Sequence, residues 1–244
     1  MQVADSKTAV DIRPCSDVAS WQRCVDLQRE VWHFDPAELV PVHVLTVALK
    51  TGGQVLGAFD TAGAQIGFAL SFPAFRADRH YLHSHMVAVL PDWQNRGVGR
   101  RLKLAQRDEA LQRNLDLIEW TFDPLEARNA YFNIVRLGAV IRRYIPDLYG
   151  PSSSPLHRGL PTDRLLAEWH LKSPRVAGAV TGKPSQPSPG AVEISLAAIG
   201  QESSADVQAR VRFEFTRWLA RGYAVTGFAL HGETGAYFLE PYED

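Results

Sequence analysis

The chain has 244 residues, 45% of them hydrophobic and 22% charged, which is typical of a soluble globular protein with one sizeable core and an extension. Its formal net charge of −1 argues against a nucleic-acid partner, and no apolar run approaches the roughly 20 residues that a membrane span needs. Because the N-terminus lacks the pattern of a signal peptide, we expect a cytoplasmic location in which Cys15 and Cys24 stay reduced.

Hydrophobic periodicity predicts a mixture of helices and strands in the first half of the chain. The turn at 60–63 favours an antiparallel hairpin between the strands on either side of it. In chain order we predict a strand at 10–14, helices at 17–32 and 36–49, strands at 54–59, 65–75 and 81–90, and a helix that reaches residue 114.

A helix is predicted to follow the next strand, at 115–122. Asp123 can cap this helix, Pro124 suits its first turn, Glu126 completes a capping box and Gly138 ends it. The later elements are strands at 140–149 and 164–171 around a segment rich in proline and serine, a linker at 173–190, a strand at 192–196, a helix at 204–221, and strands at 224–230 and 236–240.

Two glycines mark the junction between the strand at 81–90 and the helix after it. Gly97 and Gly99 lack the Cβ atoms that hinder backbone amides from turning toward one point, and a helix N-terminus favours an anion there. A dinucleotide fingerprint fails because Leu102 stands at its third glycine, and the nearest P-loop pattern, 178–183, is one residue short. A local positive patch suits a phosphate-rich ligand: Arg96, Arg100, Arg101, Lys103 and Arg107.

The pattern Gln94-x-x-Gly97-x-Gly99, preceded by an apolar strand and Pro91, resembles motif A of the GNAT superfamily of acyl-CoA-dependent N-acyltransferases. The resemblance covers roughly residues 8–172 and implies an α+β fold in three layers, with a mixed, mostly antiparallel central sheet flanked by helices. We expect an acyltransferase domain at 1–172, the linker at 173–190, and a small C-terminal α/β extension at 191–244. The extension is too small to stand alone comfortably, so it should dock on the first domain or complete its sheet.

The resemblance implies a binding mode for acetyl-CoA or another acyl-CoA as co-substrate. Pantetheine would lie between the fourth and fifth strands and pair with the fourth, while the CoA pyrophosphate would meet the amides of the glycine loop. The cofactor-binding residues expected on this basis are Val87, Ala88, Val89, Gln94, Asn95, Arg96, Gly97, Val98, Gly99 and Arg100.

Histidines are candidates for the base, because a neutral imidazole can accept a proton near pH 7. Counting back from Gln94, the catalytic acid of histone-acetylating members of the family falls on His83. His85 lies on the same strand face by period two and could contact substrate. Both could instead be half-buried strand residues, and with no carboxylate partner nearby a metal site at His80, His83 and His85 is not expected.

The proton donor of the family is a tyrosine, and this chain departs from the pattern by placing Ile134 there. Tyr131, one turn earlier on nearly the same face, could protonate the leaving thiolate, or water could do so. Asn129 and Asn133 form an i, i+4 pair that could hold amide groups of the cofactor or substrate, or could simply face solvent.

Charged residues nearby suggest contacts with the acceptor. Glu119 and Asp123 could attract a substrate ammonium, although Asp123 has the competing role of helix cap. Arg142 and Arg143 could meet a carboxylate on the acceptor or on a dicarboxylic acyl group, or could be ordinary solvated surface residues.

Residues 119–133 and 137–150 look similar to a little-characterised branch of bacterial GNAT proteins. Some members of that type acylate free amino acids, including with succinyl-CoA. The predicted function is therefore transfer of an acetyl or other short acyl group, such as succinyl, from CoA to the amine of a small molecule such as an amino acid. A peptide amine, a non-catalytic acyl-CoA-binding or sensing module, a pure scaffold and a homodimer all stay open.

Overall fold

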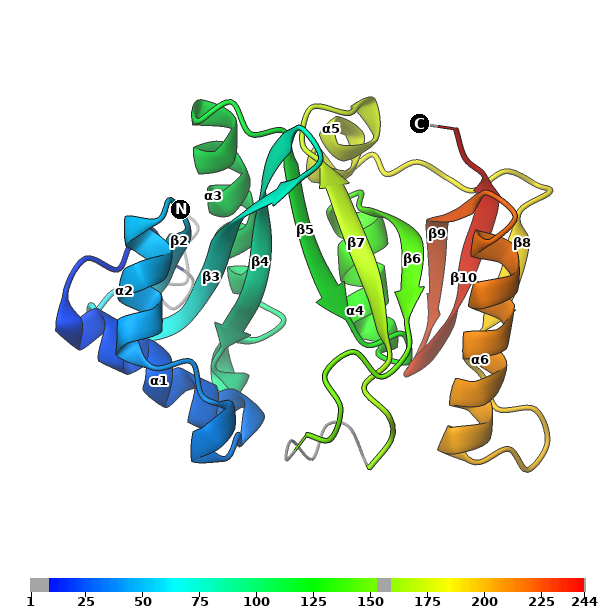
Figure 1. Cartoon of the computed structure of the whole chain (residues 1–244), viewed down its shortest axis with the longest axis horizontal. Helices are drawn as coiled ribbons and strands as arrows, with labels where there is room; N and C mark the ends of the chain where they lie inside the picture. The colour runs from blue at the N-terminus through cyan, green and yellow to red at the C-terminus, as the bar shows by residue number, and fades with distance from the viewer. Residues whose placement is uncertain (1–8, 153–158, 244) are drawn as a thin grey trace, which may run out of the picture. The chain divides into compact units, whose positions relative to one another are not determined.

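The computed structural model describes residues 9–152 and 159–243, which form two compact units (Figure 1). The first unit ends at Ile118, and the second comprises Glu119–Ser152 and residues 159–243. Residues 153–158 of the proline- and serine-rich segment lie outside the described residues.

The first unit is built on four strands that pair antiparallel in chain order, as the predicted hairpin required. Its elements are β1 (Asp11–Pro14), α1 (Val18–Trp32), η1 (Pro36–Glu38), α2 (Val42–Lys50), β2 (Gln54–Phe59), β3 (Gln65–Arg76), β4 (Arg79–Val89), η2 (Pro91–Trp93) and α3 (Val98–Gln112).

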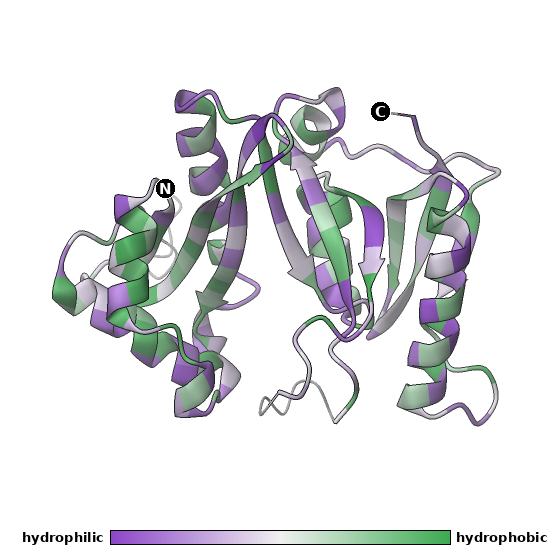
Figure 2. Cartoon of the chain, in the orientation of Figure 1, coloured by the Kyte–Doolittle hydropathy of each residue, from purple (hydrophilic) through white to green (hydrophobic). Residues whose placement is uncertain are grey.

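Helices pack against this sheet and form two separate hydrophobic clusters with it. One cluster joins Leu27 of α1 and Leu45 of α2 to Phe68 of β3, and the other joins Val98 and Leu102 of α3 to the strands. The α1, α2 and α3 ribbons carry bands of apolar and polar residues, as expected for helices that bury one face (Figure 2). A helix–sheet–helix arrangement results, in agreement with the predicted three layers.

The helix predicted at 36–49 is wrong, because the chain forms two pieces there. The short turn η1 ends at Glu38, and α2 begins only at Val42, after Pro41 at its cap position. Proline has no backbone N–H, so a proline at position 41 suits the start of a helix and disrupts its interior.

The second unit contains the remaining strands in the order β5-β7-β6-β9-β10-β8. The ladders β6–β7, β6–β9, β9–β10 and β8–β10 are all antiparallel. Its elements are β5 (Leu117–Phe122, whose first two residues belong to the first unit), α4 (Ala127–Tyr131), η3 (Phe132–Arg136), β6 (Val140–Ile145), β7 (Arg164–His170), α5 (Pro174–Val180), β8 (Val192–Ser195), α6 (Ser204–Leu219), β9 (Tyr223–His231) and β10 (Thr234–Pro241).

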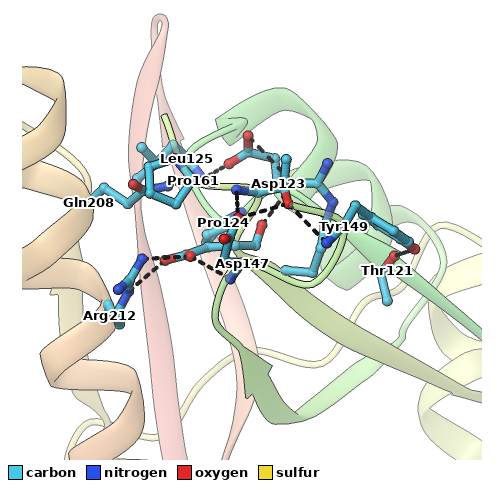
Figure 3. Close-up of polar contacts among 12 residues, drawn as sticks. Thr121, Asp123, Pro124, Leu125, Asp147, Tyr149, Pro161, Gln208 and Arg212 are labelled. Atoms are coloured by element: carbon cyan, nitrogen blue, oxygen red, sulfur yellow. Dashed lines mark hydrogen bonds and ion pairs between the residues drawn. The ribbon is translucent and has the colours of Figure 1, made fainter. Parts of the chain in front are cut away.

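The C-terminal residues continue the sheet of this unit, because Ile141 of β6 pairs with Val225 of β9. Phe215 of α6 stacks on Tyr144 of β6, with ring centroids 5.5 Å apart. Arg212 donates hydrogen bonds of 2.9 and 2.7 Å to the two carboxylate oxygens of Asp163, and Gln208 donates to the carbonyl of Pro161 at 2.9 Å (Figure 3). Apolar packing and polar contacts therefore hold α6 to the strands and loop beside it.

The helix predicted to begin at Asp123 begins later, at Ala127. The carboxylate of Asp123 accepts a hydrogen bond from the Leu125 amide at 2.8 Å, which forms a local turn instead of a helix cap. The helix widens to a π turn over η3, where the Leu137 amide donates to the carbonyl of Phe132, and Gly138 at a φ of +81° ends it as predicted.

A helix that the sequence pattern did not predict, α5, lies within residues 173–190. Ser173 caps it by accepting a hydrogen bond from the Val176 amide at 3.2 Å, and Val176 and Ala179 are buried. The serine cap followed by Pro174 was the local signal for this start.

Candidate active site

The glycine loop turns backbone amides at the N-terminus of α3. Asn95 and Gly97 have φ values of +58° and +79°, in the left-handed region, and no side chain caps the first turn of α3. A Cβ built on Gly97 would meet no described atom within 4 Å beyond its chain neighbours, and one built on Gly99 would meet only Val89, at 4.0 Å. The loop therefore has room beside both glycines, and the N-terminal end of the helix dipole favours an anion there.

Gln94 acts on the loop itself. Its side-chain amide donates a hydrogen bond of 2.9 Å to the carbonyl of Val89, at the end of β4. This contact ties the loop to the strand, so the conformation of the loop depends on Gln94 whether or not this side chain touches a ligand.

The predicted positive patch contains one residue fewer than expected. Arg96 and Arg101 are exposed, and the guanidinium of Arg96 lies over the ring of Trp93 at 5.6 Å. Lys103, in contrast, is 2% exposed and donates to the hydroxyl of Ser84 at 3.1 Å. It belongs to the interface between α3 and β4 because the next turn of α3 faces the sheet.

A β-bulge interrupts β4 at the predicted base. Leu70 of β3 pairs with Met86 but Ser71 pairs with Ser84, so His85 is the extra residue. The rings of His83 and His85 are 6.3 Å apart, which makes them neighbours, although the bulge breaks the strict alternation on which the same-face prediction relied. His83 is half-buried and His85 is exposed beside Phe72.

Both imidazoles are held toward the neutral form. Burial lowers the pKa of His83, and the charge of Lys103 adds to the effect. His85 reaches solvent at its surface, but the protein packed around its ring, with a contribution from His83, lowers its pKa to about 4. Burial also lowers the pKa of Lys103 itself, but since burial is the larger cause for His83, its direction holds even with a neutral Lys103.

Val87, Ala88 and Val89 follow the bulge and pair with β3 opposite Ala69, Phe68 and Gly67. Behind them, polar side chains that sequence reasoning missed form a buried network. Ser84 donates to the side chain of Gln106 at 3.0 Å, Gln54 donates to the Gln106 carbonyl at 3.1 Å, and Ser71 donates to Gln54 at 2.9 Å. Small hydroxyls inside otherwise apolar strands were the available signal.

The predicted acceptor carboxylates occupy separate ion pairs in the second unit. Glu119 on β5 is buried, with its carboxylate 3.6 Å from the guanidinium of Arg143. Asp123 is held in its turn and lies 4.0 Å from Arg164. Arg143 thus lies beside Glu119, and Arg164 lies beside Asp123.

Glu168 of β7 joins the same group of charges as Glu119. Arg142 lies 2.6 Å from the carboxylate of Glu168 and Arg143 lies 3.6 Å from it. Burial opposes ionisation of Glu168, but the contact with His170 and the two arginine charges outweigh it and lower its pKa. Sequence reasoning did not single out Glu168, since its role depends on strand pairing.

The helix α4 and the π turn η3 that follows it carry the other predicted residues. The side-chain amide of Asn133 donates to Asn129 at 3.2 Å, so the predicted i, i+4 contact exists, with Asn133 buried and Asn129 exposed. Tyr131 is half-buried directly before the π turn, whereas Ile134 is buried. A π turn of this kind often occurs at functional sites.

Within residues 9–152 and 159–243, no group of three or more His, Cys, Asp or Glu is placed to hold a metal ion. His80 packs against Phe75, with ring centroids 4.8 Å apart. Over the same described residues, no helix is both long and apolar enough to cross a membrane.

Comparisons with known proteins agree with this geometry. The model of the family described as "Acetyltransferase (GNAT) family" matches residues 10–133, just over half of the 244 residues. A search of curated proteins found no match to the sequence.

Solved structures share the fold at low identity. The ribosomal-protein-S18-alanine N-acetyltransferase from Escherichia coli is 13% identical with a TM-score of 0.53, over 68% of this chain and 96% of that one. The yncA structure from Salmonella typhimurium, with its cofactor acetyl-CoA, is 18% identical with a TM-score of 0.54, over 68% and 95%. NAA60 from Arabidopsis thaliana, in complex with a bisubstrate analogue, is 11% identical with a TM-score of 0.50, over 66% and 97%.

Proposed function

The chain belongs to the GNAT acetyltransferase family, and from this membership we propose that it transfers an acetyl or other short acyl group from acyl-CoA to the amine of a small molecule such as an amino acid. The observation that carries the proposal is the loop before α3, in which Asn95 and Gly97 have left-handed φ values. The acetyl-CoA bound to yncA, a structure of the same fold, supports acyl-CoA as the donor.

The donor would be held mainly by backbone. The amides of residues 95–100 would bind the CoA pyrophosphate, with Arg96 and Arg100 adding positive charge. The backbone at 87–89 would carry the pantetheine arm.

The proposed reaction is direct attack of a neutral amine on the thioester carbonyl. The C–N bond forms, the C–S bond breaks, and the proton of the amine passes to His83, whose lowered pKa keeps it ready to accept. The CoA thiolate leaves and takes a proton from Tyr131 or from water. His85, Asn129 and Asn133 are the proposed contacts with substrate and cofactor amides.

Turnover with acetyl-, propionyl- and succinyl-CoA and a panel of amines, followed as free thiol, tests this function. Thermal unfolding with CoA separates binding from chemistry, since CoA at one hundred times Kd should add about 2.7 kcal/mol of stability. Binding without turnover of any pair would contradict the transferase and favour the acyl-CoA-sensing module. Absence of CoA binding would contradict both.

A further inference from the structure

Three strands of the second unit bring a half-exposed arginine over two buried carboxylates. Glu119 of β5 is 2% exposed and Glu168 of β7 is 3% exposed, whereas the side chain of Arg143 on β6 is 45% exposed. A guanidinium nitrogen of Arg143 lies 3.6 Å from each carboxylate. In the strand order β5-β7-β6 both acids lie on the same side of β6, so the side chain of Arg143 reaches across β7 toward β5.

Stability does not explain this arrangement well. Each buried carboxylate loses several kcal/mol of hydration, and apolar side chains of similar volume usually serve a core at least as well. Arg142 already takes one oxygen of Glu168 at 2.6 Å, so a second arginine is not needed to compensate that charge. The charges do have one clear effect, which is to hold the guanidinium of Arg143 in place.

The hydrogen-bond donors of Arg143 are available. A separation of 3.6 Å is a Coulombic contact and too long for a hydrogen bond. Among the described residues no side-chain hydrogen bond of Arg143 is found, although nearly half of the side chain faces solvent. A guanidinium fixed in this way can offer two parallel donors to a planar carboxylate.

Polar groups on β5 continue the same face. Thr121 lies two residues after Glu119, and strand periodicity places it on the same side of the sheet. Its hydroxyl is 2.8 Å from the hydroxyl of Tyr149, which is half-exposed. Trp120, between them, packs against Trp169, so the apolar face of β5 is the opposite one.

We propose that Arg143 is a specificity-determining residue that binds a carboxylate of a small-molecule substrate. This inference rests on the proposed function and narrows its substrate class. Either the acceptor is a free amino acid or a related amino-carboxylate, or the acyl group is a dicarboxylic one, and both present the same carboxylate chemistry to the guanidinium. An N-terminal peptide amine offers no carboxylate next to its amine.

Paired substrates test the inference and identify the source of the carboxylate. One arm compares free amino acids with their amides as acceptors, and the other compares succinyl-CoA with propionyl-CoA as donors. In one of the two arms, we expect kcat/KM for the substrate with the carboxylate to exceed that for its uncharged counterpart by about tenfold to a hundredfold. Arg143→Gln should remove that preference, mainly by raising KM. Arg143→Lys should keep part of the preference, because lysine keeps the positive charge but lacks the paired donors of the guanidinium.

Arg217→Gln is the matched control, since this α6 arginine in the same unit has a side chain 44% exposed. It should leave the preference unchanged, and circular dichroism verifies that each variant is folded. Turnover with no carboxylate preference in either arm overturns the inference while leaving the transferase intact.

If no amine is turned over, the transferase proposal fails and calorimetry still decides the inference. Amino acids and succinyl-CoA are then titrated against their uncharged counterparts, with the parent protein and with Arg143→Gln. Binding that needs both the carboxylate and Arg143 supports the inference, and equal or absent binding overturns it.

Discussion

Gly97 has a left-handed backbone conformation and lies in the loop that we propose binds the CoA pyrophosphate. With a φ of +79°, an alanine there would cost about 1–2 kcal/mol, or the loop would relax and turn its amides away. We expect Gly97→Ala to raise the Kd for CoA about tenfold or more, because each lost hydrogen bond to a charged group is worth about 1.5–3 kcal/mol. Isothermal titration with CoA measures the change.

Gly182 provides the control for that substitution. Its φ is +82° and a Cβ there also meets no described atom within 4 Å, so Gly182→Ala adds the same backbone strain away from the loop. An equal loss of CoA affinity in both variants would mean that strain, and not the loop amides, sets the affinity.

The histidines of β4 predict how activity depends on pH. A base must be neutral to accept a proton, and the pKa of His83 lies below its usual 6.5. When kcat/KM is calculated per concentration of neutral amine, its acid limb should therefore have a midpoint below pH 6.5, and His83→Ala should lower kcat about 10²- to 10⁴-fold.

His80→Ala is the control for the base, since His80 is exposed at the start of β4. A pH–rate profile with its midpoint at or above 6.5, or a His83→Ala variant as active as His80→Ala, contradicts the assignment of His83.

At the residue scale, the sequence predicted local backbone geometry where spacing alone defines it, as at Gly97 with its φ of +79°. The motif alone identified Gly97, because a residue with a left-handed φ at this position of the loop is usually a glycine. The contact of Gln94 with Val89 and the burial of Lys103 could not be identified in this way, since both depend on where a neighbouring strand lies.

Between elements, Ser84 links β4 to α3. Its hydroxyl accepts from Lys103 and donates to Gln106, all within a buried interface. Ser84→Ala removes one hydrogen-bond partner from Lys103 and one from Gln106, and we expect a loss of about 1–3 kcal/mol in the free energy of unfolding. Denaturant titration measures this loss. As a control, Ser185→Ala at an exposed serine should change the free energy of unfolding by no more than about 0.5 kcal/mol. Equal stabilities would show that the network carries no net energy.

Element boundaries were predictable where one local device sets them. Gly138 ends the helix containing α4 because its left-handed φ cannot continue a helix, and the turn at 60–63 gave the β2–β3 hairpin. The break before α2 and the late start of α4 were missed. In both cases two local options competed, as with Asp123, which uses its carboxylate for a turn instead of a cap.

For the whole molecule, the C-terminal extension is the least predictable part. Its strand and helix patterns were visible in the sequence, but its attachment through the ladder between Ile141 and Val225 requires partners more than 80 residues apart. The family model matches only residues 10–133, so it gives no pattern with which the strands of the extension could be recognised. Long-range pairing of this kind leaves no local signal.

Asp163 is the residue on which that attachment can be tested. It is fully buried and accepts hydrogen bonds from Tyr144, from the Asp147 amide at 3.0 Å, and from Arg212 of α6 (Figure 3). Removing one partner of a buried ion pair typically costs about 3–5 kcal/mol, because the remaining charge loses its compensation. Arg212 is itself 38% exposed, so solvent screens the pair and we expect Arg212→Met to cost about 3 kcal/mol or less.

For a chain of this size such a loss corresponds to a fall in Tm of up to about 10 °C, which calorimetry can resolve. Arg217→Met, on the same helix, removes a surface ion pair with Glu214 and a contact with the ring of Trp218, and should change Tm little. If the two variants melt alike, the Arg212–Asp163 contact does not hold α6, and the packing of Phe215, stacked on Tyr144 and edge-on to Tyr237, must supply the attachment. Phe215→Ala would then cost about 3–5 kcal/mol as a fully buried aromatic, while Phe213→Ala, exposed on the same helix, would not.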